Sequence, residues 1–159
     1  MGTINVGISD LNIAREPDVL ATYALGSCVG ICLYDEKIKL AGLAHIMLPW
    51  SAEASNTGDN ARRFADTGIT ELISMMCRNG TSVNKLTAKI AGGAQMFKTK
   101  SAVFNIGDRN VAAVKKVLSS YKIPIIAEQT GENYGRTVFF YSANGKMEIR
   151  AATRPTIIV

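Results

Sequence analysis

The sequence contains little histidine or cysteine and no long hydrophobic run. Of its 159 residues one is histidine and three are cysteine, with no Cys-x-x-Cys pair. One histidine without a Cys/His cluster argues against a zinc site, and an odd cysteine count argues against a disulfide framework. No apolar run approaches the ~20 residues that span a bilayer, and the N-terminus has no basic segment before an apolar one. We therefore expect a cytoplasmic protein with reduced thiols, no metal and no membrane insertion.

Charge is also sparse. Charged residues make up 19% of the chain and apolar residues 47%, which excludes intrinsic disorder and favours a single domain over residues 1–159. Eighteen basic and thirteen acidic residues give a net charge of +5. Because the basic residues are scattered in ones and twos, they favour acidic partners in general rather than a nucleic acid.

Hydrophobic periodicity predicts a mixture of strands and two helices. One helix should begin at Asp59 or Asn60 and end at Gly80, and the other should be capped by Asp108 and end near Tyr121. Strands are expected over residues 4–13, 19–24, 29–34, 38–48, 86–91, 102–106, 123–128, 136–141 and 146–151. Two helices are too few to cover both faces of a doubly wound sheet, so we expect a layered α/β sandwich with mixed and antiparallel strands.

The lone histidine, His45, lies in the second strand of a predicted hairpin whose first strand begins at Cys28. With Glu36–Lys37 as the loop tip, the antiparallel register places Cys28 directly opposite His45. Opposed side chains on one face have Cβ atoms ~4.5–5.5 Å apart, close enough for a thiol and an imidazole to share a hydrogen bond. A register shifted by two would leave them diagonal neighbours on the same face, whereas a shift by one would separate them.

Such a pair suits nucleophilic catalysis, because an imidazole base converts a weakly acidic thiol into the reactive thiolate. The bend at Gly26–Ser27 would leave the Cys28 backbone N–H free to stabilise an oxyanion. Thr22 and Tyr23 are both within chain reach to orient the imidazole. The alternative is structural, since cysteine and a lone histidine on an apolar strand are commonly core residues.

The remaining motifs favour structural roles. Cys32 and Cys77 are interpreted as core residues. The segment Ala91–Gln95 lacks a complete phosphate-binding motif, so no cofactor is expected. Gly107–Asn110 is best explained as a helix start.

Two blocks of this sequence, Leu25–Asp35 and Gly42–Pro49, resemble the CheD family of chemoreceptor glutamine deamidases. Further matching segments follow in order through nearly the whole chain, namely Arg63–Asp66, Lys89–Phe97, Ile106–Val111 and Gly135–Arg136.

The resemblance implies a three-layer α/β/β sandwich related to bacterial toxin deamidases. It also implies hydrolysis of selected receptor glutamines to glutamate and ammonia, and in some members of glutamyl methyl esters. The family triad maps to Cys28 as nucleophile, His45 as base and then acid, and Thr22 as the residue that orients the imidazole. The implied partners are the cytoplasmic helices of methyl-accepting chemoreceptors and the CheC phosphatase. The loops over residues 50–60 and 92–97 are expected to form the rim that docks the receptor.

Two other functions remain open. The chain could act as a non-catalytic adaptor that binds receptors or CheC and tunes signalling. It could also be a small cysteine hydrolase that acts on a metabolite amide.

Overall fold

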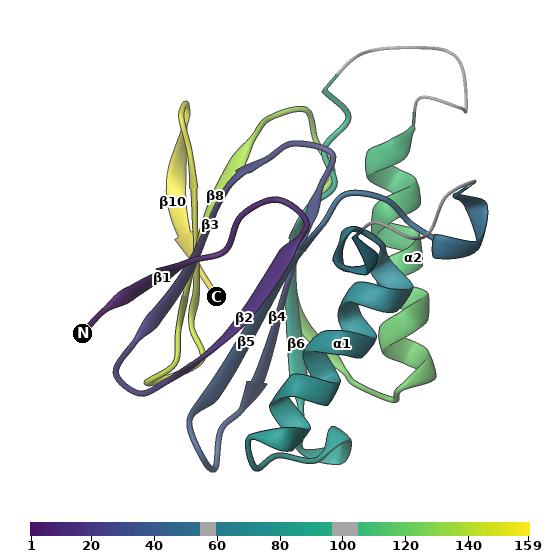
Figure 1. The fold of residues 1–159 in the computed structure, drawn as a ribbon. Coiled ribbons are helices and arrows are strands. Elements are labelled where there is room, and N and C mark those ends of the chain that lie inside the picture. Colours follow the sequence, from purple (N-terminus) through teal and green to yellow (C-terminus); the bar gives the residue numbers. More distant parts are fainter. Residues whose placement is uncertain (55–59, 97–104) are drawn as a thin grey trace.

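The computed structural model describes residues 1–54, 60–96 and 105–159, and it arranges them in three layers (Figure 1). Two helices cover one face of a five-stranded sheet, and a second five-stranded sheet packs on the other face. We call the covered sheet the inner sheet and the other one the outer sheet. The expected three-layer α/β/β sandwich is confirmed.

The inner sheet has the strand order β2-β5-β4-β6-β7. Its pairs are antiparallel except for the parallel pair of β6 and β7. Its strands are β2 (Asp10–Arg15), β4 (Val29–Asp35), β5 (Leu40–Ile46), β6 (Thr87–Gly92) and β7 (Ile125–Thr130).

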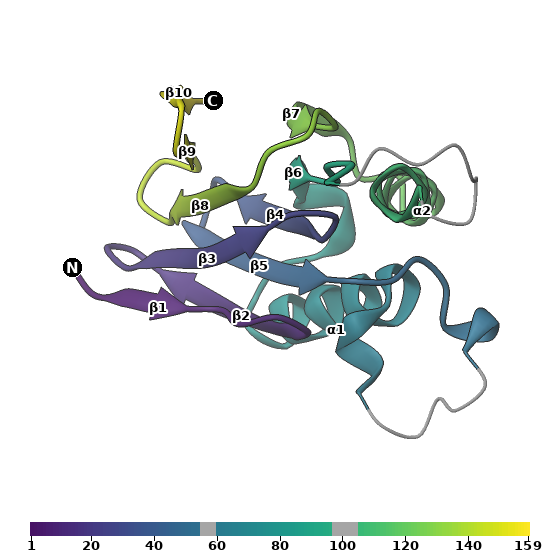
Figure 2. The same ribbon diagram turned by 90° about the horizontal axis from the view of Figure 1, so that it is seen from above.

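The outer sheet has the order β1-β3-β8-β9-β10, with β1 and β3 parallel and the other pairs antiparallel. Figure 2 shows this sheet and the helices on opposite sides of the inner sheet. Its strands are β1 (Thr3–Asn5), β3 (Val19–Leu25), β8 (Arg136–Tyr141), β9 (Met147–Ala151) and β10 (Arg154–Ile158).

The helices are α1 (Ala65–Arg78) and α2 (Ile106–Ser120), and three short 3₁₀ turns occupy Ser51–Glu53 (η1), Ala61–Arg63 (η2) and Val83–Lys85 (η3). α1 packs closely on β5, because a Cβ at Gly42 would lie 3.0 Å from a methyl carbon of Leu72. No helix in the described ranges is long and apolar enough to cross a membrane.

Strand β5 separates two hydrophobic cores, because successive side chains of a strand point to opposite faces. Ala44 and Ile46 belong to the core between the inner sheet and the helices. Ala41 and Leu43 belong to the core between the two sheets. His45, the next residue in this second series, therefore points between the sheets.

The predicted hairpin register is wrong by two residues. Asp35 pairs with Leu40 rather than Ile38, so the loop has four residues and Gly30, not Cys28, lies opposite His45. The cause is local: the Lys37 N–H donates to Asp35 Oδ1 at 3.0 Å, and Lys39 adopts a positive φ of 54°. Glu36–Lys37 is not a pair that favours a two-residue primed turn.

Both predicted helix starts also need correction. Asn60 caps η2, where its side chain accepts from the Arg62 N–H, and α1 begins only at Ala65. Asp108 lies inside the first turn of α2, whose cap position is Asn105. Asp59 and most of the strand predicted over 102–106 lie outside the described residues, and Ile106 belongs to α2.

The segment predicted as one strand over residues 4–13 forms two strands in different sheets, β1 and β2. Between them the chain passes from the outer sheet to the inner sheet. This crossing places Val6 and Ser9 beside the strands that carry Thr22 and His45.

Candidate active site

His45 lies near the end of β5 and is fully buried. It is flanked in the sheet by Gly30 of β4 and Asp10 of β2. Gly30 has no side chain on this face, where Leu25 and Leu43 fill the adjacent space. His45 is thus a buried polar residue that lies opposite the strand that follows Cys28.

Thr22 of β3 reaches His45 across the gap between the sheets. Its hydroxyl lies 2.7 Å from His45 Nδ1 and 2.7 Å from the backbone oxygen of Val6. A hydroxyl has one proton, and the Val6 carbonyl can only accept, so Thr22 donates to Val6 and accepts from the Nδ1–H of His45. This chain of two hydrogen bonds fixes the tautomer and leaves Nε2 with its lone pair free.

The free nitrogen is buried as well. His45 Nε2 has no hydrogen-bond partner among the described protein atoms, although buried polar atoms are nearly always paired. An unpaired, unprotonated imidazole nitrogen is the form that a general base requires.

Cys28 is half-buried in the turn between β3 and β4, and its side chain packs against the core between the sheets. It therefore shares the face of His45 as a diagonal neighbour, and no hydrogen bond joins the two side chains. Diagonal neighbours on an antiparallel pair are ~7–8 Å apart. The two groups lie on one side of the sheet, but the directly opposed contact expected from the sequence is absent.

Burial shifts both groups toward their neutral forms. Desolvation raises the pKa of Cys28 above its ordinary value, a shift that its own backbone N–H partly offsets. Desolvation lowers the pKa of His45 to about 4. At neutral pH the site therefore holds a thiol and a neutral imidazole rather than an ion pair.

Two glycines allow the chain after β6 to pack against the Cys28 turn. Gly92 has a positive φ of 109°, and a Cβ there would lie 2.3 Å from the Cys28 carbonyl oxygen. The Gly93 N–H donates to that oxygen at 2.8 Å. Among the hydrogen bonds of the described chain, the Cys28 N–H donates to no other residue.

Arg136 of β8 contacts the end of β6 and the segment after β7 from the outer sheet. The guanidinium is 2% exposed and donates to the carbonyls of Gly92 and Gly131, at 3.4 and 3.0 Å. It also lies over the ring of Tyr134, 4.4 Å from the centroid. Carbonyl oxygens, the side-chain oxygen of Gln129 at 3.4 Å and an aromatic face thus replace the carboxylate that usually accompanies a buried cation.

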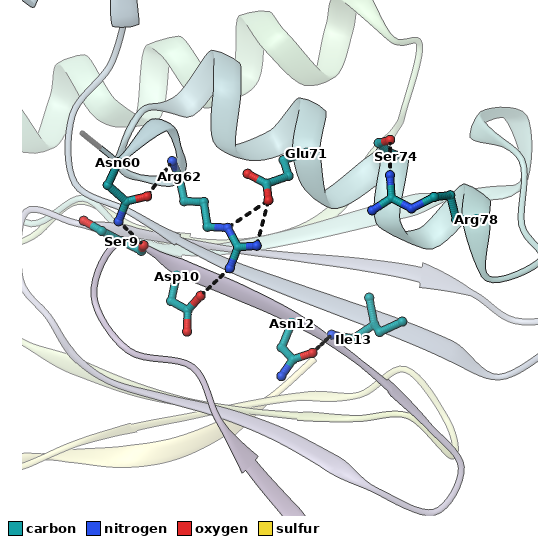
Figure 3. A network of polar contacts seen from close by, with 9 residues as sticks. All are labelled: Ser9, Asp10, Asn12, Ile13, Asn60, Arg62, Glu71, Ser74 and Arg78. Carbon is teal, nitrogen blue, oxygen red and sulfur yellow. Dashed lines mark hydrogen bonds and ion pairs between the residues drawn. The ribbon is translucent and has the colours of Figure 1, made fainter. Parts of the chain in front are cut away.

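A polar network supports the His45 strand from outside (Figure 3). Arg62 of η2 forms ion pairs with Asp10 of β2 at 2.8 Å and Glu71 of α1 at 2.7 Å. Asn60 donates to the Ser9 carbonyl at 2.7 Å, and the Ser9 N–H donates to the His45 carbonyl at 3.0 Å. The network joins the segment after β5 to the strand beside His45.

Comparisons with known proteins agree with this architecture. A family model described as CheD chemotactic sensory transduction matches residues 47–151. The chain belongs to the CheD family. Because the matched range begins after Thr22, Cys28 and His45, the family match and the geometry of these three residues are separate observations.

Two CheD relatives match almost the whole chain. The chain is 50% identical over 149 residues to the probable chemoreceptor glutamine deamidase CheD of Caldanaerobacter subterraneus subsp. tengcongensis, covering 92% of this chain and 91% of the relative. It is 52% identical over 149 residues, with the same coverage, to the protein of that name from Clostridium novyi. The crystal structure of Neisseria meningitidis protein NMB0706 has the same fold, with a TM-score of 0.54 at 8% identity, covering 89% of this chain and 75% of that one.

Of the two residues that the sequence offers for orienting the imidazole, Thr22 and Tyr23, one lies beside His45. Thr22 contacts His45, whereas Tyr23 is 49% exposed and packs edge-to-face on Phe139. Cys32 is buried between the sheets, and Cys77 packs against the helical core, so both occupy the core positions expected of them. Residues 55–59 and 97 of the expected docking rim lie outside the described part of the chain.

Sequence reasoning missed two features of the site, Arg136 and Asn110. Arg136 belongs to a segment that resembles the CheD family, but its residue type and position predict no role for it. Asn110 looked like part of a helix start, yet it is fully buried and donates to the carbonyls of Ser27 and Met47. The available signal was that both residues stand in segments that resemble the family, Arg136 directly after Gly135 and Asn110 three residues after Gly107.

Proposed function

We propose that this CheD-family protein deamidates selected glutamines of methyl-accepting chemoreceptors, with Cys28 as nucleophile, His45 as general base and acid, and Thr22 as the residue that orients the imidazole. The observation that carries the proposal is the Thr22–His45 hydrogen bond, which leaves an unprotonated, unpaired Nε2 on the face that Cys28 shares. The substrate class comes from the relatives, which are named probable chemoreceptor glutamine deamidases.

The first half of the reaction forms a thioester. As Cys28 Sγ attacks the amide carbon, His45 Nε2 takes the thiol proton, and the amide oxygen gains the negative charge. The Cys28 N–H, which has no other acceptor in the described chain, is available to that oxyanion. The protonated imidazole then gives its proton to the departing nitrogen, which leaves as ammonia.

The second half restores the enzyme. His45 takes a proton from water, the resulting hydroxide attacks the thioester carbon, and the sulfur leaves and is reprotonated by the imidazole. The products are a glutamate side chain and free Cys28. Because burial disfavours both the thiolate and the imidazolium, we expect the proton to move together with the attack rather than before it.

The substrate side of the proposal draws on charge and on the family resemblance. A net charge of +5 favours encounter with an acidic surface. The proposed partners are the cytoplasmic helices of chemoreceptors, which would place the protein in the cytoplasm, and the CheC phosphatase.

The test is incubation of a purified chemoreceptor cytoplasmic fragment with the protein, followed by peptide mass spectrometry. Each amide converted to an acid gains about 1 Da, and one ammonia is released per conversion. Cys28→Ala should abolish both signals, while Cys77→Ala, which removes another half-buried thiol, should retain them.

Three results would contradict the proposal. The wild-type protein could bind the receptor and leave its peptides unchanged, which would support the adaptor function. Cys28→Ala could convert them as fast as the wild type. Turnover could be confined to free glutamine or another small amide, which is the metabolite hydrolase.

A further inference from the structure

We infer that Asn110 is a positioning residue of the active site, which ties the Cys28 turn to the end of the strand that carries His45. The inference rests on the proposed function only in naming these two groups as catalytic. Its structural basis is one amide that bridges two segments far apart in the sequence.

The side chain of Asn110 emerges from the first half of α2 and is fully buried. Its Nδ2 donates to the carbonyl of Ser27 at 2.9 Å and to that of Met47 at 3.1 Å. Ser27 directly precedes Cys28, and Met47 lies two residues after His45. Both protons of the amide are thus used to join the two catalytic segments.

The orientation of the amide follows from its partners. Two backbone carbonyls can only accept, so the nitrogen must face them and the oxygen must point away. Asn110 Oδ1 is consequently left buried without a hydrogen-bond partner among the described protein atoms. An apolar residue would avoid this unpaired acceptor but would remove the donor from the Ser27 and Met47 carbonyls, so the bridge explains why an amide stands at this buried position.

The surrounding backbone brings α2 close enough for this contact. A Cβ at Gly107 would lie 2.4 Å from the Ala94 carbonyl oxygen, and one at Gly93 would lie 2.2 Å from a methyl carbon of Val111. Gly93 in turn donates to the Cys28 carbonyl. The glycines allow the approach, and Asn110 provides the directional bonds.

The test compares three variants of the full chain. Asn110→Ala removes the amide, and Asn110→Leu fills a similar volume without donors. Asn79→Ala is the matched control, because it removes an amide-to-carbonyl bond of 2.7 Å, from Asn79 Nδ2 to the Met75 carbonyl, at the far end of α1. Each is assayed for kcat and KM on the receptor fragment, and for alkylation of individual cysteines by iodoacetamide across pH.

Without the bridge the Cys28 turn separates from the His45 strand, and small displacements of reacting groups cost up to about 100-fold in rate. We expect both Asn110 variants to lower kcat about 10- to 100-fold with KM within about twofold. Alkylation of Cys28 should become faster and its pH midpoint should fall, because a looser turn exposes the thiol. Asn79→Ala should leave all three quantities unchanged.

Cys32, which is 1% exposed, reports general loosening in the same samples. The inference is wrong if Cys32 alkylation rises together with that of Cys28, or if kcat of the Asn110 variants matches that of Asn79→Ala. If the wild type does not deamidate receptors, the proposed function fails. In that case a Cys28-specific change in alkylation would still support the positioning role, and its absence would still refute it.

Discussion

The two faces of the inner sheet bury different chemistry. Toward the helices, β5 presents Gly42, Ala44 and Ile46, and these residues pack in an apolar cluster with α1, while the buried amide of Asn110 on α2 lies beside the Cys28 turn. Toward the outer sheet, the same strand presents His45, which meets Thr22 from the opposite layer.

Arg136 is a further polar side chain buried on the second face. Burying a polar group costs stability unless the group has a hydrogen-bond partner. Among the described residues, His45 Nε2 and Arg136 Nε on this face have no hydrogen-bond partner, and neither does Asn110 Oδ1 of α2 on the helix side. The comparison indicates that the apolar cluster between β5 and the helices supplies stability, whereas the polar groups around Cys28 and His45 give up some stability for reactivity.

The largest effects should come from one substitution in each of the two cores, which should affect catalysis in one case and stability in the other. We expect His45→Gln to lower kcat for receptor deamidation about 10²- to 10⁴-fold, the usual contribution of a general base. Leu72→Ala, in the helical core, should instead lower the free energy of unfolding by about 2–5 kcal/mol. It should leave kcat per folded molecule within about twofold.

Both variants are checked by steady-state kinetics and by urea denaturation. A large loss of kcat in Leu72→Ala at full folded fraction would show that the two cores are not separable. Unchanged kcat in His45→Gln would remove the imidazole from the reaction.

A pH titration of stability sharpens the same comparison. Because burial lowers the pKa of His45 from 6.5 to about 4, the unfolded chain takes up this proton first as the pH falls. The contribution of the neutral imidazole is therefore complete above pH 6.5 and is lost progressively down to about pH 4, by roughly 3 kcal/mol in total.

Urea denaturation at several pH values measures this loss. Subtracting the curve of His45→Gln from that of the wild type removes the pH dependence that arises from the carboxylates common to both proteins. The difference should increase with pH between 4 and 6.5 and be flat above. Parallel curves would mean that the folded protein accommodates a charged His45.

The sequence predicted the features that depend on residues near one another in the chain. It did not predict the features that depend on single side-chain contacts or on packing between distant segments. Most strands and both helices could be assigned from periodicity, and the pairing of β4 with β5 placed Cys28 and His45 on one face. The register could not be obtained, because the loop is set by the Asp35 side chain and by the positive φ of Lys39. Neither feature has a distinctive pattern in the residue types.

The supporting residues of the site show the same limit. Thr22 and Tyr23 are equivalent candidates in the sequence, and only the packing of the outer sheet directs Thr22 toward His45. Asn110 stands in a helix that looks ordinary until α2 is placed against Ser27 and Met47. These contacts arise from tertiary packing, which local periodicity does not specify.

The smallest expected effect concerns the single hydroxyl that crosses from one sheet to the other. Thr22→Val keeps the shape of the side chain but leaves the Nδ1–H of His45 and the Val6 carbonyl unpaired. A buried group without its partner costs about 1–3 kcal/mol, so we expect kcat to fall about 10- to 100-fold as the tautomer and ring orientation lose their support.

Thr22→Ser should retain most of the activity, because it keeps the hydroxyl, and Tyr23→Phe should be indistinguishable from the wild type. The kinetic measurement is the ratio of kcat values at constant KM on the receptor fragment. Equal activity of Thr22→Val and Thr22→Ser would mean that packing alone orients the imidazole. In that case the two sheets would contribute to catalysis by shape and not through the hydrogen bond that joins them.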